Sequence, residues 1–191
     1  DYRPHGFKIN VQKFYHALGR YGFSLDPTHP TPTNITIRNC VAHGNTGRAG
    51  AGNWTGSGIV AAGVQTCLIE YCVAYNNGGD GFDAVSGTAA QLVNCVAVTN
   101  GAYGFNLGVT GWLHSCASYN NTSGRTNATP QDDVNAITLS GDPFVDAPNG
   151  DFRPDNTASE GALLRAAAGP GVTAPYYEDD ARVKLAAAAK Q

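Results

Sequence analysis

The chain has 191 residues, with 24 glycines, five cysteines, no methionine, 14% charged residues and a formal net charge of −3. This length suits one domain with a sizeable core, and a mildly acidic chain without a Lys/Arg cluster argues against a nucleic-acid partner. No apolar run approaches the length that crosses a bilayer, so we expect neither a membrane segment nor a membrane partner.

Residues 1–33 are predicted to form one or two irregular turns. Gly6-Phe7 and Gly22-Phe23 carry the same Gly-aromatic pair, here called the Gly-Phe word. Three prolines between residues 27 and 32 then exclude a helix and a central strand, because proline lacks the N–H that either element needs. We expect a loop there.

Residues 34–121 contain a repeat. A cysteine followed five residues later by an asparagine occurs four times, and the Gly-Phe word or a Gly-Ile variant recurs out of phase with it. Short apolar-alternating runs between Gly/Asn turns are typical of strands. A repeat of about 23 residues with two or three strands predicts an all-β solenoid, the right-handed parallel β-helix.

Stacking of such units brings equivalent positions into columns about 4.8 Å apart. We predict that the repeat cysteines (Cys40, Cys72, Cys95 and Cys116) lie inside as free thiols, without disulfides or zinc. The asparagines (Asn45, Asn77, Asn100 and Asn121) should take the left-handed conformation at a bend and hydrogen-bond along the stack. Two rows are expected to face outward: Ser24, Val60, Asp83 and Asn106, and His43, Tyr75, Val98 and Tyr119.

The remaining sequence is divided by composition. Residues 122–150 are polar and irregular and complete a β-helix domain predicted at 1–150. A C-terminal segment at 151–183 is predicted to cap the last exposed turn, as the ends of a solenoid require. Residues 184–191 are expected to be a vector-derived tail.

Ionisable side chains are densest at the junction between the early turns and the proline-rich loop. Tyr21, Asp26 and His29 lie within nine residues of each other. Such a set supplies a proton donor, an orienting carboxylate and a base. Alternatively, Asp26 begins an Asx turn before Pro27 and His29 is solvated.

A second group of candidates is the pair Asp80 and Asp83, three residues apart at a turn-strand junction. Two carboxylates there could bind Ca²⁺ or substrate hydroxyls, or could satisfy the amides of the turn. Aromatic side chains suited to stacking on sugar rings, or to packing beneath loops, are Trp54, Tyr75, Trp112 and Tyr119.

The run from Tyr21-Gly22-Phe23 through Asp26-Pro27 to His29, followed by Asn34-Ile35-Thr36-Ile37 and Val41-Ala42-His43, resembles the catalytic A-module of mannuronan C5-epimerases. The likeness covers residues 20–108, with Ser24-Leu25 and Thr28 inserted relative to the family motif. The phrases Val73-Ala74-Tyr75-Asn76-Asn77 and Asp80-Gly81-Phe82 are shared with many pectate-lyase-like β-helices, including family 9 pectate lyases, whose lysine base has no counterpart here.

This resemblance implies that Tyr21 and His29 flank C5 of a uronic acid as proton donor and acceptor, with Asp26 supporting them. Removing a proton beside a carboxylate requires that the carboxylate be neutralised, either by an arginine or by Ca²⁺ held by Asp80 and Asp83. The side chains expected to contact substrate are Arg20, Arg38, Arg48, Tyr75, Asp83 and Asn106.

Two classes of function follow. The first is an enzyme acting on an alginate- or pectin-like polyuronate, as an epimerase or a β-eliminating lyase. The second is a non-catalytic glycan-binding or structural module of a cell-surface or phage-tail protein. The expected partner is an acidic polysaccharide, the expected location is secreted or extracellular, and the expected state is a monomer or a β-helix trimer.

Overall fold

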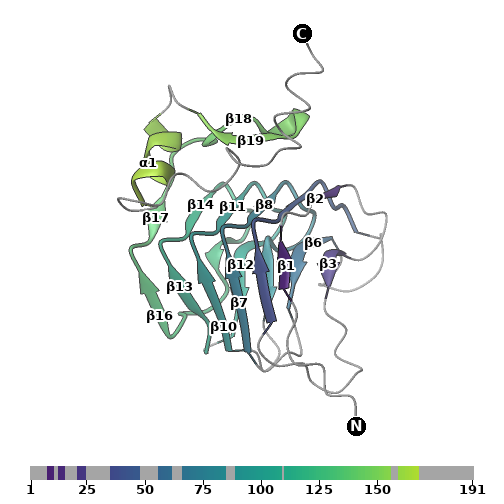
Figure 1. Cartoon of the computed structure of the whole chain (residues 1–191), viewed down its shortest axis with the longest axis vertical. Helices are drawn as coiled ribbons and strands as arrows, with labels where there is room; N and C mark the ends of the chain where they lie inside the picture. The colour runs from purple at the N-terminus through teal and green to yellow at the C-terminus, as the bar shows by residue number, and fades with distance from the viewer. Residues whose placement is uncertain are drawn as a thin grey trace.

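The computed structural model is a solenoid of short parallel strands with a hairpin and a helix along one side (Figure 1). It describes residues 8–10, 13–15, 21–24, 35–47, 56–61, 66–84, 89–108, 110–155 and 159–167. No helix in these ranges is long and apolar enough to cross a bilayer.

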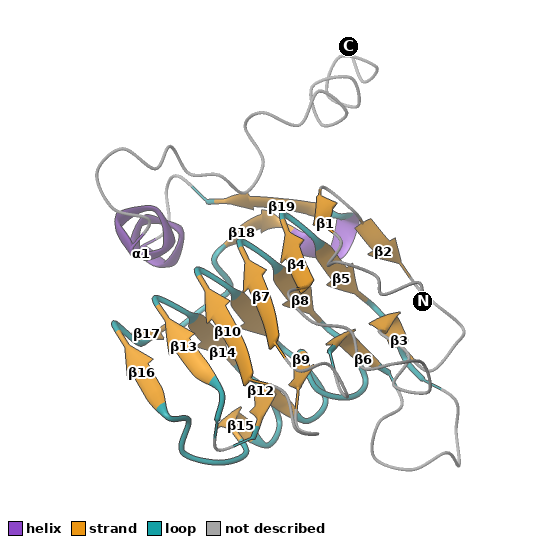
Figure 2. Cartoon of the chain, turned by 60° about the horizontal axis from the view of Figure 1, so that its bottom comes forward, coloured by secondary structure: helices purple, strands orange, loops and turns teal. Residues whose placement is uncertain are grey.

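Three parallel sheets form the sides of the solenoid. Sheet 1 contains β1 (Lys8–Asn10), β4 (Ile35–Arg38), β7 (Thr66–Glu70), β10 (Ala89–Val93), β13 (Trp112–His114) and β16 (Asp132–Val134), and it forms the broad face in Figure 2. Sheet 2 contains β2 (Lys13–Tyr15), β5 (Val41–His43), β8 (Val73–Tyr75), β11 (Val96–Val98), β14 (Ala117–Tyr119) and β17 (Ile137–Thr138). Sheet 3 contains β3 (Tyr21–Ser24), β6 (Ser57–Val60), β9 (Phe82–Ala84), β12 (Tyr103–Leu107) and β15 (Gly124–Thr126). Each coil adds one strand to each sheet in the same order, which confirms the predicted parallel β-helix.

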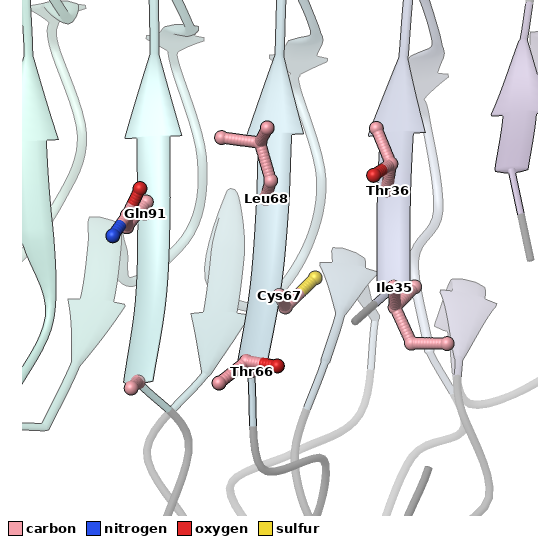
Figure 3. A pocket seen from close by; sticks show the side chains of 7 residues that line it. Ile35, Thr36, Thr66, Cys67, Leu68 and Gln91 are labelled. Carbon is pink, nitrogen blue, oxygen red and sulfur yellow. The ribbon is translucent and has the colours of Figure 1, made fainter. Parts of the chain in front are cut away.

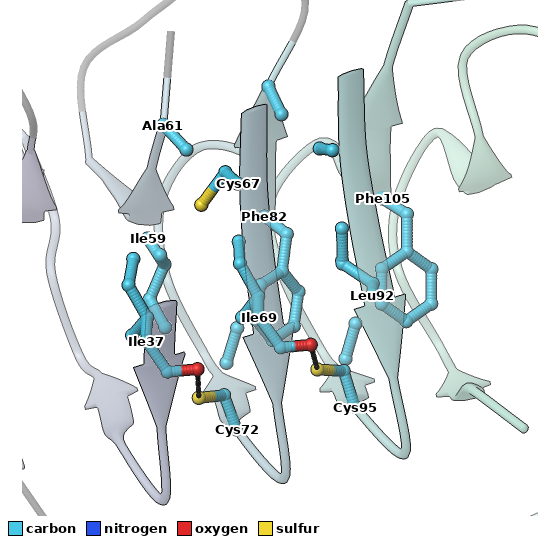
Figure 4. Packing of buried hydrophobic residues seen from close by; sticks show 14 of the residues in the cluster. Ile37, Ile59, Ala61, Cys67, Ile69, Cys72, Phe82, Leu92, Cys95 and Phe105 are labelled. Atoms are coloured by element: carbon cyan, nitrogen blue, oxygen red, sulfur yellow. Dashed lines mark hydrogen bonds between the residues drawn. The ribbon is translucent and has the colours of Figure 1, made fainter. Parts of the chain in front are cut away.

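The predicted interior columns are confirmed. Ile37 pairs in register with Ile69, Ile69 with Leu92, and Leu92 with Leu113, and all four side chains are buried. The repeat cysteines are fully buried and every cysteine is a free thiol. Figure 4 shows two repeat thiols that reach back one coil: Cys72 Sγ donates to the Ile37 carbonyl at 3.8 Å and Cys95 Sγ to the Ile69 carbonyl at 3.4 Å. The thiols therefore fill a narrow corner and also satisfy backbone oxygens.

The asparagine column is a continuous chain of buried hydrogen bonds. Asn45 Nδ2 donates to Asn77 Oδ1 at 2.7 Å, Asn77 Nδ2 to Asn100 Oδ1 at 2.9 Å, and Asn100 Nδ2 to Asn121 Oδ1 at 2.9 Å. Each acceptor oxygen also takes the backbone N–H of the preceding asparagine in the column. The predicted bonding along the stack is thus confirmed.

The predicted left-handed conformation is wrong by one residue. Positive φ angles belong to the residues just before the ladder asparagines, namely Gly44, Asn76, Thr99 and Asn120, with φ between 50° and 66°. A second such column precedes the cysteines, at Asn39, Tyr71, Asn94 and Ser115. The residue before the asparagine makes the corner, because the asparagine itself must turn its amide inward to reach the next coil.

The stack continues beyond residue 121, since β15, β16 and β17 extend all three sheets. Its last coil places Asp133 opposite Leu113, at a position that is apolar in earlier coils. Arg125 closes this end: its guanidinium donates to Asp133 at 2.9 Å and to the Cys116 carbonyl at 3.1 Å, and it lies 5.3 Å from the centre of the Phe105 ring. An inward-facing ion pair on the terminal coil discourages a further strand from adding there.

The described part of the C-terminal segment packs against one side of the solenoid. The antiparallel hairpin of β18 (Phe144–Asp146) and β19 (Asp151–Pro154) runs along the outer face of sheet 2 (Figure 1), and most of the segment predicted as a cap lies outside the described residues. A 3-10 turn (Ala147–Asn149) joins its strands, and α1 (Ser159–Ala167) lies beside β17. Phe144, Phe152 and Leu164 are buried against apolar side chains of sheet 2. That face is apolar and needs a cover, whereas the solenoid end already carries a polar pair.

Candidate functional site

Strand register aligns the row predicted on sheet 3, but Val60 and Asp83 in that row are buried rather than outward and exposed. Ser24 pairs with Val60, Val60 with Asp83, and Asp83 with Asn106. The strand that begins at Tyr21, β3, therefore lies in the same sheet as Asp83 and Asn106. It is two coils away from β9, the strand that carries Asp83. Arg20, Asp26, His29, Arg48 and Trp54 lie outside the described residues, as does the side chain of Tyr21.

The Gly-Phe word has a structural cause that positions this row. A Cβ on Gly81 would lie 2.6 Å from the Gly104 carbonyl and 2.8 Å from the Asn100 amide, so the corner has no room for a side chain. The next residue, Phe82, points inward and stacks on Phe105 with ring centres 5.4 Å apart. Alternation along the strand then directs the following residue, Asp83, to the outer side of the sheet.

Asp80 joins two coils. Its Oδ1 accepts the Tyr103 N–H at 2.8 Å and its Oδ2 accepts Asn106 Nδ2 at 2.7 Å, while its own N–H donates to Ser57 Oγ at 3.2 Å. Burial raises the pKa of Asp80 above its ordinary value, and the two donated hydrogen bonds oppose that shift. Asp80 therefore satisfies amides, which is the alternative that the sequence left open for it.

Asp83 is the more enclosed of the two carboxylates, with 1% of its surface exposed. A carboxylate buried this far must interact with polar groups or bind a proton, because desolvation strongly disfavours the charged form. Together with Asn106 it is the polar part of the sheet 3 row that the structure describes.

A calcium site would need more ligands than these two residues give, since Ca²⁺ takes roughly six to eight oxygens. Within the described ranges, no group of three or more His, Cys, Asp or Glu side chains could hold a metal ion. Both oxygens of Asp80 already accept hydrogen bonds, so coordination by Asp80 would break its links to the next coil.

The predicted substrate-binding residues are spread over all three faces. Arg38 lies on sheet 1, where its Nε donates to Glu70 Oε2 at 2.7 Å. Tyr75 lies on sheet 2, where the hairpin covers it: its ring centre is 5.6 Å from that of Phe152, and its hydroxyl donates to Asp142 Oδ2 at 3.0 Å. Burial and the Asp142 carboxylate raise the pKa of Tyr75 to about 12. Neither residue shares a face with Asp83 and Asn106.

Sequence reasoning missed three polar residues that shape these faces. Asp142 holds the Tyr75 hydroxyl, Asn127 Oδ1 accepts the Leu107 N–H at 2.8 Å on sheet 3, and Arg125 closes the last coil. The sequence does contain a signal for Asn127 and Arg125. They follow Asn106 and Gly104 of the preceding coil by 21 residues each, so the repeat continues past residue 121.

The comparisons with known proteins agree with this architecture. The family model for the right-handed beta helix region matches residues 8–138, and the chain belongs to that family. A comparison with curated proteins and one with solved structures gave no significant match. The matched range spans the strands from β1 to β17 and ends where the chain leaves the stack.

Proposed function

We propose that this β-helix protein acts on an acidic polysaccharide, a polyuronate of the alginate or pectin type, along the outer face of sheet 3. The observation that supports this is the register of β3: it places the strand beginning at Tyr21 in the sheet that carries Asp83 and Asn106. A polymer lying across the strands of that sheet would pass from the proposed catalytic residues to the partly exposed Asn106, whereas Asp83 is buried beneath the surface.

The proposed reaction starts with removal of the C5 proton of a uronic acid. His29 takes the proton from one face of the sugar, and Tyr21 donates a proton to the opposite face in an epimerase. In a lyase, the electron pair left at C5 instead expels the 4-linked sugar and forms a C4–C5 double bond. Asp26 positions the imidazole of His29.

Neutralisation of the substrate carboxylate falls to Arg20 or Arg48 in this proposal. Arg38 is paired with Glu70 on sheet 1, a different side of the solenoid. A cation close to the sugar carboxylate lowers the energy of the carbanion-like transition state, and in a water-poor groove this electrostatic contribution is large.

The second candidate is a non-catalytic glycan-binding or structural module. The bonding of Asp80 favours it, because both oxygens of this carboxylate hold neighbouring coils together, which is a structural role.

The test is incubation with polymannuronate and with polygalacturonate, each with added Ca²⁺ and with EDTA. Ultraviolet absorbance of the unsaturated product reports a lyase, and the anomeric region of the proton NMR spectrum reports an epimerase. We expect turnover by the wild type, its loss in His29→Ala, and normal turnover in His114→Ala, a histidine on sheet 1. Binding of either polymer without conversion would favour the second candidate instead.

The thermal midpoint separates catalysis from folding. A residue that acts in a loop on the substrate can be lost with little change in stability. If His29→Ala unfolds the protein, or if it retains full turnover, the proposed base is wrong.

A further inference from the structure

The outer face of sheet 1 contains a hollow that the proposed function does not use. Its volume is about 260 Å³ (Figure 3). It is lined by residues of three neighbouring strands: Ile35, Thr36, Thr66, Cys67, Leu68, Ala89 and Gln91. The size is slightly below the roughly 300–1,000 Å³ of pockets that enclose a drug-sized ligand, so it suits one small ring and not a large cofactor.

The lining is uncharged. It offers threonine hydroxyls and the exposed amide of Gln91 beside the apolar surface of Leu68. The titratable group in it is Cys67, and burial raises the pKa of this thiol to about 12, so it stays neutral in physiological conditions. An ionic ligand would lose hydration here without meeting an opposite charge.

An aromatic platform continues the same face. Trp112 pairs in register with Gln91, one strand further along sheet 1. The indole is held on two sides: its Nε1 donates to Gln131 Oε1 at 2.7 Å, and its ring lies nearly parallel to that of His114, with an interplanar angle of 8° and centres 6.2 Å apart. A half-buried indole fixed in this way loses little side-chain freedom when a flat ring stacks on it.

The charges near Trp112 select the kind of ligand. On the other side of Trp112, Asp132 is in register with it and presents a carboxylate. Further along the face, Arg38 and Glu70 neutralise each other in an ion pair. A uronate would meet repulsion from Asp132, whereas a neutral sugar would find acceptors and donors for its hydroxyls in Asp132 and Gln91.

We propose that the outer face of sheet 1 binds a neutral hexose chain, with one ring on Trp112 and a neighbouring ring in the hollow beside Gln91. The rings of an extended β-linked chain repeat at nearly the spacing of adjacent strands, which is about 4.8 Å. A chain lying across the strands can therefore place successive rings over successive coils. This binding face is separate from sheet 3, and it does not depend on whether the protein converts a polyuronate.

The test uses cellohexaose and mannohexaose as neutral probes, with hexagalacturonate as the acidic comparison, in calorimetric titrations of the whole chain. We expect at least one neutral probe to bind. Its affinity should fall about tenfold in Trp112→Ala, because stacking contributes up to about 1.4 kcal/mol. It should fall about fivefold in Gln91→Ala, where one hydrogen bond is lost.

Val145→Ala, which replaces an exposed residue of the hairpin, is the control variant and should bind as the wild type does. Thermal unfolding checks that each variant is folded, and Gln91 is exposed enough that its loss leaves the core intact. The proposal is overturned if neither neutral probe binds, or if Gln91→Ala and folded Trp112→Ala bind with unchanged affinity. Equal binding of hexagalacturonate through Trp112 would overturn the selectivity for a neutral chain.

Discussion

The asparagine ladder gives the most quantitative prediction, for the substitution Asn77→Ala. Asn77 is 2% exposed, and its side chain makes four hydrogen bonds, two from Asn45 and one each to Asn100 and to the Ala42 carbonyl. Alanine removes all four and leaves the partners without water to replace them. Each buried group left unpaired costs about 1–3 kcal/mol, so three such groups predict a loss of about 3–9 kcal/mol.

Asn121→Ala is the matched control, because Asn121 has the same type and position but lies at the end of the ladder. It accepts two hydrogen bonds from Asn100 and donates one to the Ala97 carbonyl, and it is only half-buried. Water can reach the abandoned partners, so the predicted loss is about 1–2 kcal/mol.

Equilibrium unfolding in urea, followed by far-ultraviolet circular dichroism, measures both free energies of unfolding. Domains of ordinary stability unfold at about 5–15 kcal/mol, so the Asn77 variant should be strongly destabilised and the Asn121 variant mildly so. Equal losses in the two variants would refute the reasoning, because the cost would then not depend on burial of the abandoned groups.

Two further predictions concern the solenoid end and sheet 3. Replacing Arg125 by leucine removes the partner of the inward-facing Asp133. We expect the free energy of unfolding in urea to fall by about 1–3 kcal/mol, and to be recovered in part when Asp133→Leu is added. If the double variant recovers no stability, Arg125 does not close the end of the solenoid. Burial raises the pKa of Asp80 in the folded protein, so the unfolded chain loses this proton at a lower pH than the folded protein does. Stability therefore declines as the pH rises above about 4, and Asp80→Asn should remove this part of the decline. Thermal midpoints across pH measure this, and an unchanged slope would show that another group causes it.

The sequence predicted the stack because every repeated residue is used in the same way in each coil. The cysteine corner and the Gly-Phe word reappear once in each coil, although the repeat cysteines are 32, 23 and 21 residues apart, and stacking brings them into register. The glycine is needed because a Cβ on Gly81 would lie 2.6 Å from the next coil's carbonyl, so its recurrence marks the corner before sheet 3. Strand register and the interior columns follow from this repetition.

Features that occur once were not predictable in this way. The hairpin lies on sheet 2 because Phe144 and Phe152 pack against Tyr75, which is 69 and 77 positions away from them in the sequence, and no repeat indicates this contact. The left-handed positions were displaced by one residue because side-chain direction, and not residue preference, decides which residue makes the bend.

The candidate site was predictable only in part for a similar reason. Its sheet 3 row follows from the repeat, and the register of Asp83 with Asn106 is confirmed. Asp26 and His29 belong to a part of the sequence that does not repeat and lies outside the described residues, so their roles stay predictions. Arg38 was grouped with Asp26 and His29 because it is close to them in the sequence. It lies in β4, however, and this strand belongs to sheet 1.

The most direct test of the proposed activity is exchange at C5 of the polymer. Polymannuronate and polygalacturonate are incubated with the protein in heavy water, and the proton NMR signal of C5 is followed in the polymer and in any fragments. Abstraction by His29 predicts that the C5 signal disappears, by deuterium uptake or by formation of the double bond, with the wild type and not with His29→Ala. A C5 signal that persists unchanged in both polymers, with a folded protein, would contradict proton abstraction and leave a module that only binds glycans.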